Sequence, residues 1–142
     1  APNITTDVVT IASKGNGVEF GELSTKVFGM GAFSNSVRGV FGGGYTPGYA
    51  HVVDDIQFYT MASDGNAITF GDLTARNGSP AGTSNQVRGI FAGGYFSPGN
   101  NSDRAQFITI ASTGNASDFG DMTTSFNRAD GFSDSHGGLG GY

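Results

Sequence analysis

Acidic residues recur at one position of a repeated phrase, and paired carboxylates are groups that general acid and base catalysis uses. The residue after each Phe-Gly pair of this phrase is acidic, as Glu22, Asp72 and Asp121. These carboxylates are separated by 50 and 49 residues, so each belongs to a different structural unit. We therefore interpret them as structural residues, and the phenylalanines before them as hydrophobic anchors, namely Phe20, Phe70 and Phe119.

Two arginines recur in the same way, in the phrases VRGVF and VRGIF. A guanidinium group can pair with a carboxylate or donate several hydrogen bonds to carbonyl oxygens. We expect Arg38 and Arg88 to pair with the repeated carboxylates or to cap carbonyl groups between sheets. Either role is structural.

The residues Asp64-Gly-Asn66 offer oxygen ligands at close spacing, as a calcium site would require. The equivalent positions to Asp64 carry Lys14 and Thr113, and no Asp-x-Asp-x-Asp loop is present. This pattern favours a tight turn over a cation site. The histidines, His51 and His136, stand in dissimilar contexts, which argues against a zinc or copper centre. We expect no metal and no cofactor.

Motifs that carry other catalytic chemistry are missing. The sequence has no G-x-S-x-G elbow, no phosphate-binding G-x-x-x-x-G-K loop and no H-E-x-x-H pair, each of which supplies a nucleophile, an anion site or a metal site. Cysteine is absent, which excludes thiolate chemistry. We expect that the protein is not an enzyme.

Composition limits the partners and the fold class. The net charge is −5, with only 7 Lys and Arg among 142 residues, which argues against a nucleic-acid or anionic-membrane surface. No apolar run approaches the roughly 20 residues that span a bilayer, so we expect no membrane insertion. The 25 glycines and the many β-branched and aromatic residues favour short strands joined by tight turns.

The elements that position these residues follow from an internal repeat. Asn16, Asn66 and Asn115 mark three copies of an A-S-x-G-N phrase, 50 and 49 residues apart. Nearly half of the positions from 10 to 45 are identical to those from 60 to 95. A period of this length indicates a repeat architecture in which each unit buries its face against its neighbours.

Each repeat divides into four expected strands, as at residues 55–63, 67–74, 81–86 and 87–95. Apolar and polar residues alternate in the segment 55–63, as in a half-buried strand. Gly and Asn in the following turn tolerate the positive φ of tight hairpins. We expect one all-β domain over 1–142, with a half sheet (8–27), a repeat (28–76), a repeat (77–126) and a closing half sheet (127–142).

This strand pattern resembles the kelch repeats of β-propellers. A strand of small residues is followed by an apolar strand that ends in a double glycine and a tyrosine, at 43–45 and 93–95. The repeated phenylalanines stand where kelch repeats usually carry Trp, and Lys26 and Arg76 stand near the trailing basic residue. The chain departs from the pattern in having no Trp and in the shifted position of Gly140-Gly141-Tyr142.

The phrases TIASTGNASDFGDMT, RGVFGGGYTP and SDSHGGL are similar to those of kelch-like proteins of tailed phages of marine cyanobacteria. This resemblance implies propeller blades and a virion-associated or tail-adhesion role. Three sheets are fewer than the roughly 4 to 8 blades of a propeller. Two chains would complete a six-bladed ring if the terminal hairpin of one completed the first half sheet of the other. A threefold β-prism or trefoil-like domain, or a fragment of a longer propeller, are the alternatives.

The connections that do not repeat are the candidate binding loops. In a four-stranded meander, the connections 46–55, 96–105, 26–31, 75–80 and 125–130 share one face, and the S-x-G-N turns share the opposite face. Loops on a rigid scaffold commonly carry function. Exposed aromatic, amide and Arg side chains suit sugar or protein recognition, and the candidates are Tyr49, His51, Arg76, Asn77, Phe96, Asn100, Asn101, Phe126, Asn127 and Arg128.

Two functions follow as expectations. The first is a structural or adhesive virion component, such as a tail fibre, adhesin or decoration protein, whose partners are itself, other virion proteins or a cell-surface glycan. The second is a free carbohydrate-binding lectin. Either one would act in a virion or outside the cell. A lectin with one pocket per repeat would carry similar loops, whereas these loops differ, which favours the first.

Overall fold

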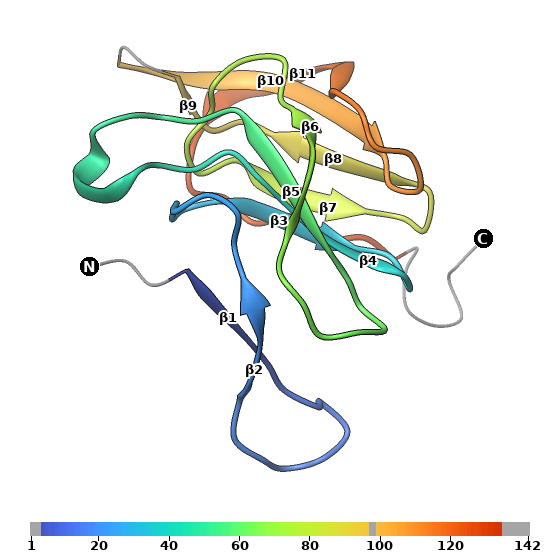
Figure 1. Cartoon of the computed structure of the whole chain (residues 1–142). Helices are drawn as coiled ribbons and strands as arrows, with labels where there is room; N and C mark the ends of the chain where they lie inside the picture. Colours follow the sequence, from blue (N-terminus) through green and yellow to red (C-terminus); the bar gives the residue numbers. More distant parts are fainter. Residues whose placement is uncertain (1–3, 97–98, 135–142) are drawn as a thin grey trace.

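The structure is a computed structural model that describes residues 4–96 and 99–134 (Figure 1). These residues form an all-β fold, which confirms the expected class. The only helical element among them is a single 3-10 turn, η1 (Pro47–Tyr49). No helix within these two ranges is long and apolar enough to cross a membrane.

The strands form three antiparallel sheets. The first sheet pairs β1 (Thr5–Val8) with β2 (Val18–Glu22). The second has the order β3-β4-β5-β6, and the third has the order β7-β8-β10-β11 with β9 beside β10. None of these sheets closes into a barrel. The bounds are β3 (Gly31–Ser34), β4 (Arg38–Gly42), β5 (Asp55–Thr60), β6 (Ile68–Asp72), β7 (Ala81–Ser84), β8 (Arg88–Ala92), β9 (Tyr95–Phe96), β10 (Asn100–Thr109) and β11 (Ser117–Phe126).

The sheets follow the order that the repeat predicts, with a half sheet before two complete sheets. The closing half sheet expected at 127–142 is tested by the structure only in its first part. Residues 127–134 contain no strand. Residues 135–142, which include His136 and the last double glycine, lie outside the described residues.

The central strand β5 differs from the expected half-buried strand, because both of its faces are covered. Ile56 and Phe58 point into the hydrophobic core, and Gln57 and Tyr59 are buried as well. Tyr59 packs edge-on against Phe20 of β2, with 5.5 Å between the ring centroids. The alternation in the sequence therefore separates two buried faces, one toward the third sheet and one toward the first.

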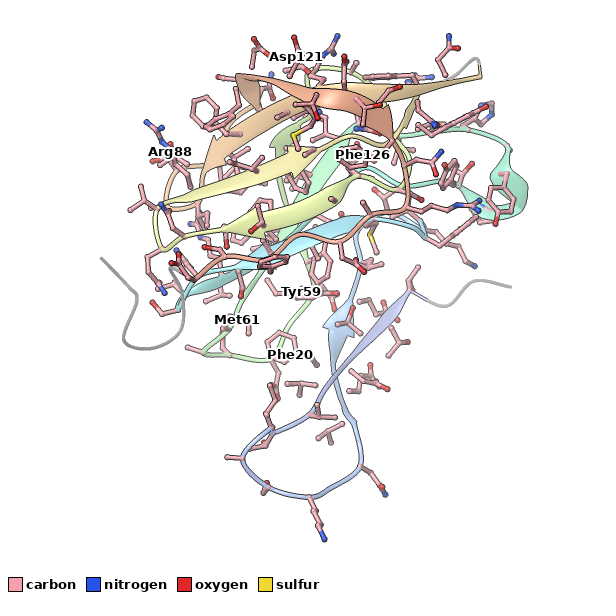
Figure 2. All side chains as sticks on the ribbon, turned by 180° about the vertical axis from the view of Figure 1, so that it is seen from behind. Phe20, Tyr59, Met61, Arg88, Asp121 and Phe126 are labelled. Atoms are coloured by element: carbon pink, nitrogen blue, oxygen red, sulfur yellow. The ribbon has the colours of Figure 1, made fainter. Side chains whose placement is uncertain are left out.

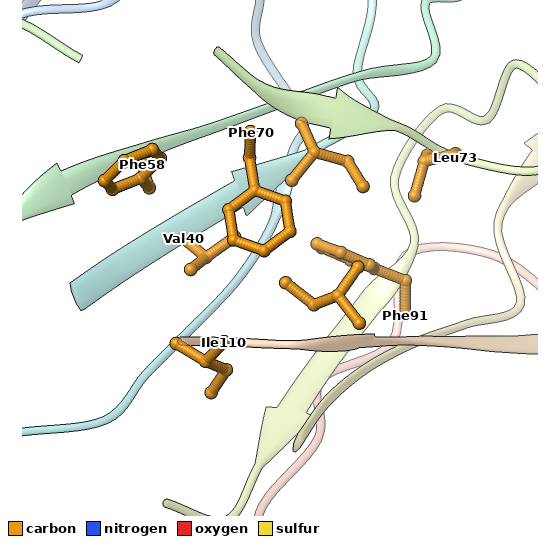
Figure 3. Packing of buried hydrophobic residues seen from close by; sticks show 8 residues of the cluster. Val40, Phe58, Phe70, Leu73, Phe91 and Ile110 are labelled. Carbon is orange, nitrogen blue, oxygen red and sulfur yellow. The ribbon is translucent and has the colours of Figure 1, made fainter. Parts of the chain in front are cut away.

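The core lies between the second and third sheets (Figure 3). It contains only apolar side chains, and burial of each large one contributes roughly 1.5 to 3 kcal/mol. Its members come from β4, β5 and the β6 region on one side and from β8, β10 and the residue just after β10 on the other: Val40, Ile56, Phe58, Phe70, Leu73, Phe91, Ile108 and Ile110. Phe58, Phe70 and Phe91 of this core are identical in other repeats, whereas Ile108 corresponds to Tyr59 in the sheet before it.

Consecutive sheets are also joined by backbone hydrogen bonds. The turns before β2, β6 and β11, which we call the GN turns, are residues 14–17, 64–67 and 113–116. The GN turn 64–67 lies along the outer edge of β2, where Gly65 N donates to Phe20 O (2.9 Å) and Ala67 N donates to Glu22 O (2.8 Å). The turn therefore extends the first sheet.

The second joint repeats the first. Gly114 N donates to Phe70 O and Ala116 N donates to Asp72 O, each over 2.8 Å. The glycine between the two carbonyl groups is required by the close approach, since a Cβ at Gly71 would lie 2.1 Å from Gly114 O. The G of the repeated F-G-[DE] phrase is thus explained by contact with the next GN turn.

The loops and the turns lie at opposite ends of the second and third sheets, as the meander predicts. Figure 1 shows η1 and β9 at one end and the β5–β6 and β10–β11 turns at the other. The loops of different sheets consequently come close together on a surface away from the GN turns.

Candidate functional site

A surface hollow of about 420 Å³ lies on the loop face. We call it the loop pocket. Eight residues from four separate segments line it: Tyr45, Tyr49, Ala50, His51, Val52, Tyr95, Asn127 and Arg128. Four of them were candidates from the sequence, namely Tyr49, His51, Asn127 and Arg128. The structure thus brings the 46–55 connection together with the connection that follows β11.

Aromatic rings form one wall of the loop pocket. Tyr45 is buried and stacks on Phe28, with 5.6 Å between the ring centroids. Tyr49 is 64% exposed and lies edge-on to Phe28 at 4.8 Å and to Tyr45 at 5.3 Å. Tyr95 lies 6.3 Å from Tyr45. The buried Tyr45 ring and the half-buried Phe28 ring hold Tyr49 in place, while most of the Tyr49 side chain stays exposed to a ligand.

Backbone hydrogen bonds hold the segment that carries Tyr49 and His51. Thr46 N donates to His51 O (2.9 Å), and His51 N donates to the Thr46 hydroxyl (3.0 Å). Tyr49 has φ 57°, in the left-handed region that non-glycine residues rarely adopt. Such a conformation persists where the surroundings impose it, and it is enriched at ligand sites.

Arg128 also has a left-handed backbone, with φ 55°, but here the repeat supplies the reason. Gly29 and Ser79 occupy the same position of their repeats and have φ 65° and 51°. Ser79 N donates to Gly29 O (2.9 Å), and Arg128 N donates to Ser79 O (3.2 Å). This backbone series places the exposed Arg128 side chain beside the tyrosines.

The chemistry of the loop pocket is that of a binding site. It combines aromatic faces with hydrogen-bonding groups from Asn127, His51 and Arg128. Sites of this kind bind ligands by stacking on the rings and by a few oriented polar contacts. Among the described residues, its lining contains no carboxylate and no thiol.

The remaining loop candidates lie in different surroundings. The Asn127 side-chain amide donates to Asn101 Oδ1, so the 96–105 connection borders the pocket. Phe96 is half-buried beneath the Arg104 guanidinium, which lies 5.2 Å from its ring. Phe126 is half-buried, and Asn100 and Arg76 are exposed.

Asn77 differs from the expectation of a surface ligand residue. It is 1% exposed, and its side-chain amide donates to Gly93 O (2.7 Å). The double glycine at 93–94 brings the backbone close enough to enclose it, since a Cβ at Gly94 would clash with Asn77. Asn77 therefore contacts the interior rather than the loop pocket.

The three anchor phenylalanines have unequal surroundings. Phe70 is 3% exposed and belongs to the core between the second and third sheets. Phe20 is half-buried against Tyr59, as Figure 2 shows. Phe119 is 55% exposed on β11 and touches Phe107 of its own sheet. Burial thus depends on whether another sheet follows.

The two repeated arginines cap and stack rather than pair with the repeated carboxylates. Arg38 Nη1 donates to Ile110 O of the third sheet (2.8 Å), and its guanidinium lies 4.4 Å from the Phe58 ring. Arg88 lies 5.0 Å from the Phe107 ring. Of the two roles expected for Arg38, carbonyl capping is the one that the structure contains.

The carboxylates of the F-G-[DE] phrase stand on three different sheets, at β2, β6 and β11. Asp72 instead lies near Asp54 and Asp55, and the oxygens of these three groups lie within 4.8 Å of one another. Asp55 is the direct cross-strand partner of Asp72. This cluster is partly exposed, and like charges placed opposite each other in a sheet destabilise it.

No protein-family model matches the chain, and no curated protein is significantly similar to it. The site therefore has to be interpreted from its own geometry.

Sequence reasoning missed two kinds of residue. Tyr45 and Tyr95 line the loop pocket, although their Gly-Gly-Tyr phrases indicated strand ends only. Gln57 and Gln106 are buried at 2% and 0% exposure. Their recurrence nine positions before the turn asparagines, with Asp7 at the equivalent place in the first sheet, was the signal that could have found them.

Proposed function

We propose that the chain is a non-catalytic structural and adhesive β-repeat module that acts by assembly and by ligand recognition through its loop face. The observation that carries this proposal is the loop pocket, where segments distant in sequence present tyrosine rings beside Arg and Asn side chains. The scaffold beneath it is held by the core and by the joints between sheets.

A cell-surface glycan is the ligand class that this pocket fits best. Sugars present apolar C–H faces that stack on aromatic rings and hydroxyl groups that accept hydrogen bonds. Tyr49 offers an exposed ring, and Arg128 and Asn127 offer donors beside it. A hollow of this shape suits a few sugar units better than a deep, enclosed small-molecule site.

The finer architecture belongs to the same proposal. The four-stranded sheets are blades of a kelch-like propeller, and a second chain brings the blades to six. The resemblance to phage repeat proteins supports a place in a virion, as a tail fibre, adhesin or decoration protein, with other virion proteins as partners.

A glycan array tests recognition. The purified chain is expected to bind a defined set of glycans, and Tyr49→Ala is expected to weaken this binding at least tenfold. Val87→Ala is the control, because Val87 is also exposed (60%) but lies in the turn between β7 and β8, at the opposite end of its sheet. Binding that Tyr49→Ala leaves unchanged would contradict the loop pocket as the site.

A free lectin is the second candidate, and the exposed Tyr49 beside Arg128 favours it too. The two functions differ in whether a single chain or an assembly of chains binds the glycan. A lectin would bind glycan as a single chain, whereas an adhesive module would bind as part of an assembly. Measuring the mass of the glycan-binding particle in solution by light scattering separates these functions.

A further inference from the structure

The joints between the sheets consist of one set of contacts that occurs twice. In the first joint, Glu22 N donates to Asn66 Oδ1 (3.1 Å) in addition to the backbone bonds of the GN turn. Ser24 N and its hydroxyl both donate to Gln57 Oε1, at 2.8 and 2.9 Å. Phe20 packs on Tyr59 across the same joint.

The second joint reproduces this set with equivalent residues. Asp72 N donates to Asn115 Oδ1 (3.1 Å). Thr74 N and its hydroxyl both donate to Gln106 Oε1, at 2.7 and 3.0 Å. Phe70 packs with Ile108 in the core. Two independent instances show that the contact set is a property of the repeat.

The strand β11 presents the same receiving edge a third time. It is the outermost strand of its sheet, and it carries Gly120, Asp121 and Thr123 at the positions of Gly71, Asp72 and Thr74. In the described part of the chain, no atom lies within 4 Å of a Cβ built at Gly120, whereas at Gly21 and Gly71 a neighbouring GN turn fills this space.

The first GN turn, residues 14–17, has the residues that would contact such an edge, and its own outer side is not covered by another of the described sheets. Within the described ranges, a Cβ built at Gly15 has nothing within 4 Å. Asn16 stands at the position of Asn66 and Asn115. Asp7 stands at the position of Gln57 and Gln106 and offers the same acceptor oxygens. Val9, 57% exposed, stands at the position of Tyr59 and Ile108.

The two unused surfaces lie at opposite ends of the molecule. Figure 2 shows Asp121 at the edge farthest from the β1–β2 hairpin, so the chain as folded here does not bring them together. At the turn itself the contact would join opposite charges, since Lys14 begins the turn and β11 carries Asp118 and Asp121, although β1 and β2 also carry Asp7 and Glu19. Opposite charges at an exposed contact favour this pairing over the alternatives.

We propose that a second copy of this chain inserts its GN turn 14–17 against β11, in the geometry of the two internal joints. Asn16 of one copy then accepts a hydrogen bond from Asp121 N of the next, Asp7 accepts from Thr123, and Val9 covers Phe119. Contacts of this head-to-tail kind close into a ring when the rotation fits. The inference deepens the assembly part of the proposed function and does not depend on the glycan.

Sedimentation velocity at rising protein concentration tests the association. The mass is expected to increase to a multiple of one chain. Asn16→Ala removes one hydrogen bond and is expected to weaken association roughly threefold to tenfold without changing the melting temperature. Asn66→Ala is the matched control, because it removes the same bond inside the chain and should lower the melting temperature instead. A single-chain mass at every concentration would overturn the proposal.

The charge of the turn provides a second test. Lys14→Glu places a negative charge beside the acidic β11 and is expected to weaken association, most strongly at low salt. Lys26→Glu makes the same charge change away from the turn and should leave association as it is. Equal effects of the two variants would show that only net charge matters, and this result would overturn the proposed contact.

Crosslinking tests the register. The chain has no cysteine, so a short bismaleimide joins only introduced residues. The pair Val9→Cys and Phe119→Cys, both at exposed positions, is expected to give covalent multimers. The pair Val9→Cys and Val87→Cys should not. Equal crosslinking of both pairs would overturn the register. Glycan binding measured on Asn16→Ala separates failure of the loop pocket from failure of this joint.

Discussion

Asn66 Oδ1 accepts a hydrogen bond from Glu22 N across 44 residues of sequence, and this bond fastens the second sheet to the first. Asn115 holds Asp72 in the same way. The asparagine of the repeated turn therefore has a partner outside its own hairpin. A residue that looked like part of a turn alone is part of the contact between repeats.

Replacing Asn115 by Ala leaves Asp72 N without its side-chain acceptor. We expect a loss of about 0.5 to 1.5 kcal/mol in the free energy of unfolding, measured by urea denaturation. Asn16→Ala is the matched variant within one chain, and it should be neutral at concentrations where the protein is monomeric. Equal losses in both variants would contradict a role in the joint.

Gly71 lies where two backbones meet, so Gly71→Ala is expected to separate the second and third sheets. The added methyl group would lie 2.1 Å from Gly114 O, and overpacking of this kind costs about 1 to 3 kcal/mol. Thermal unfolding measures the change. Gly15→Ala adds the same group at a place where no described residue lies within 4 Å, and it should change the melting temperature little. A melting temperature unaffected by Gly71→Ala would argue against the close approach.

The anchor phenylalanines allow the same Phe→Ala substitution to be compared at a buried and at an exposed position. Phe70→Ala empties a site in the core and is expected to lower the free energy of unfolding by about 3 to 5 kcal/mol. Phe119→Ala removes a side chain that is 55% exposed and should cost about 1 kcal/mol or less in the monomer. Chemical denaturation of both variants measures the difference. Similar losses would mean that β11 is already covered in solution.

The three clustered aspartates should oppose folding. Asp55→Asn removes one negative charge opposite Asp72 and is expected to raise the free energy of unfolding by about 0.2 to 1 kcal/mol. The gain should shrink in high salt, because salt screens exposed charges. Denaturation at two salt concentrations measures it. A loss of stability in Asp55→Asn at low salt would show that Asp55 has a favourable partner.

Much of the fold could be predicted because the repeat fixes the strand order. The turns at Gly65-Asn66 and Gly114-Asn115 and the apolar strands around Phe58 and Phe91 follow from local sequence. These features depend on neighbours within one hairpin, where pattern and turn chemistry are informative.

The parts that sequence did not predict depend on contacts between sheets. Burial of Gln57 requires the first sheet to lie over β5, and burial of Asn77 requires Gly93 to approach it. The loop pocket combines His51 with Asn127, which are far apart along the chain. The residue pattern within one repeat does not show which loops of different repeats come together. For this reason only half of the residues that line the loop pocket were candidates from the sequence.

The separation of loops from joints has a consequence for variation. Tyr49 and His51 make their hydrogen bonds within the 46–55 connection or line the loop pocket, and the joints use the GN turns at the other end of the strands. Residues 47–51 can therefore be exchanged while the hydrogen bonds between repeats stay, because the bond that joins this connection to the next repeat, from Asn77 N to Val53 O, lies outside them. The sequence of the ligand-facing loop can therefore diverge while the residues that hold the repeats together stay the same.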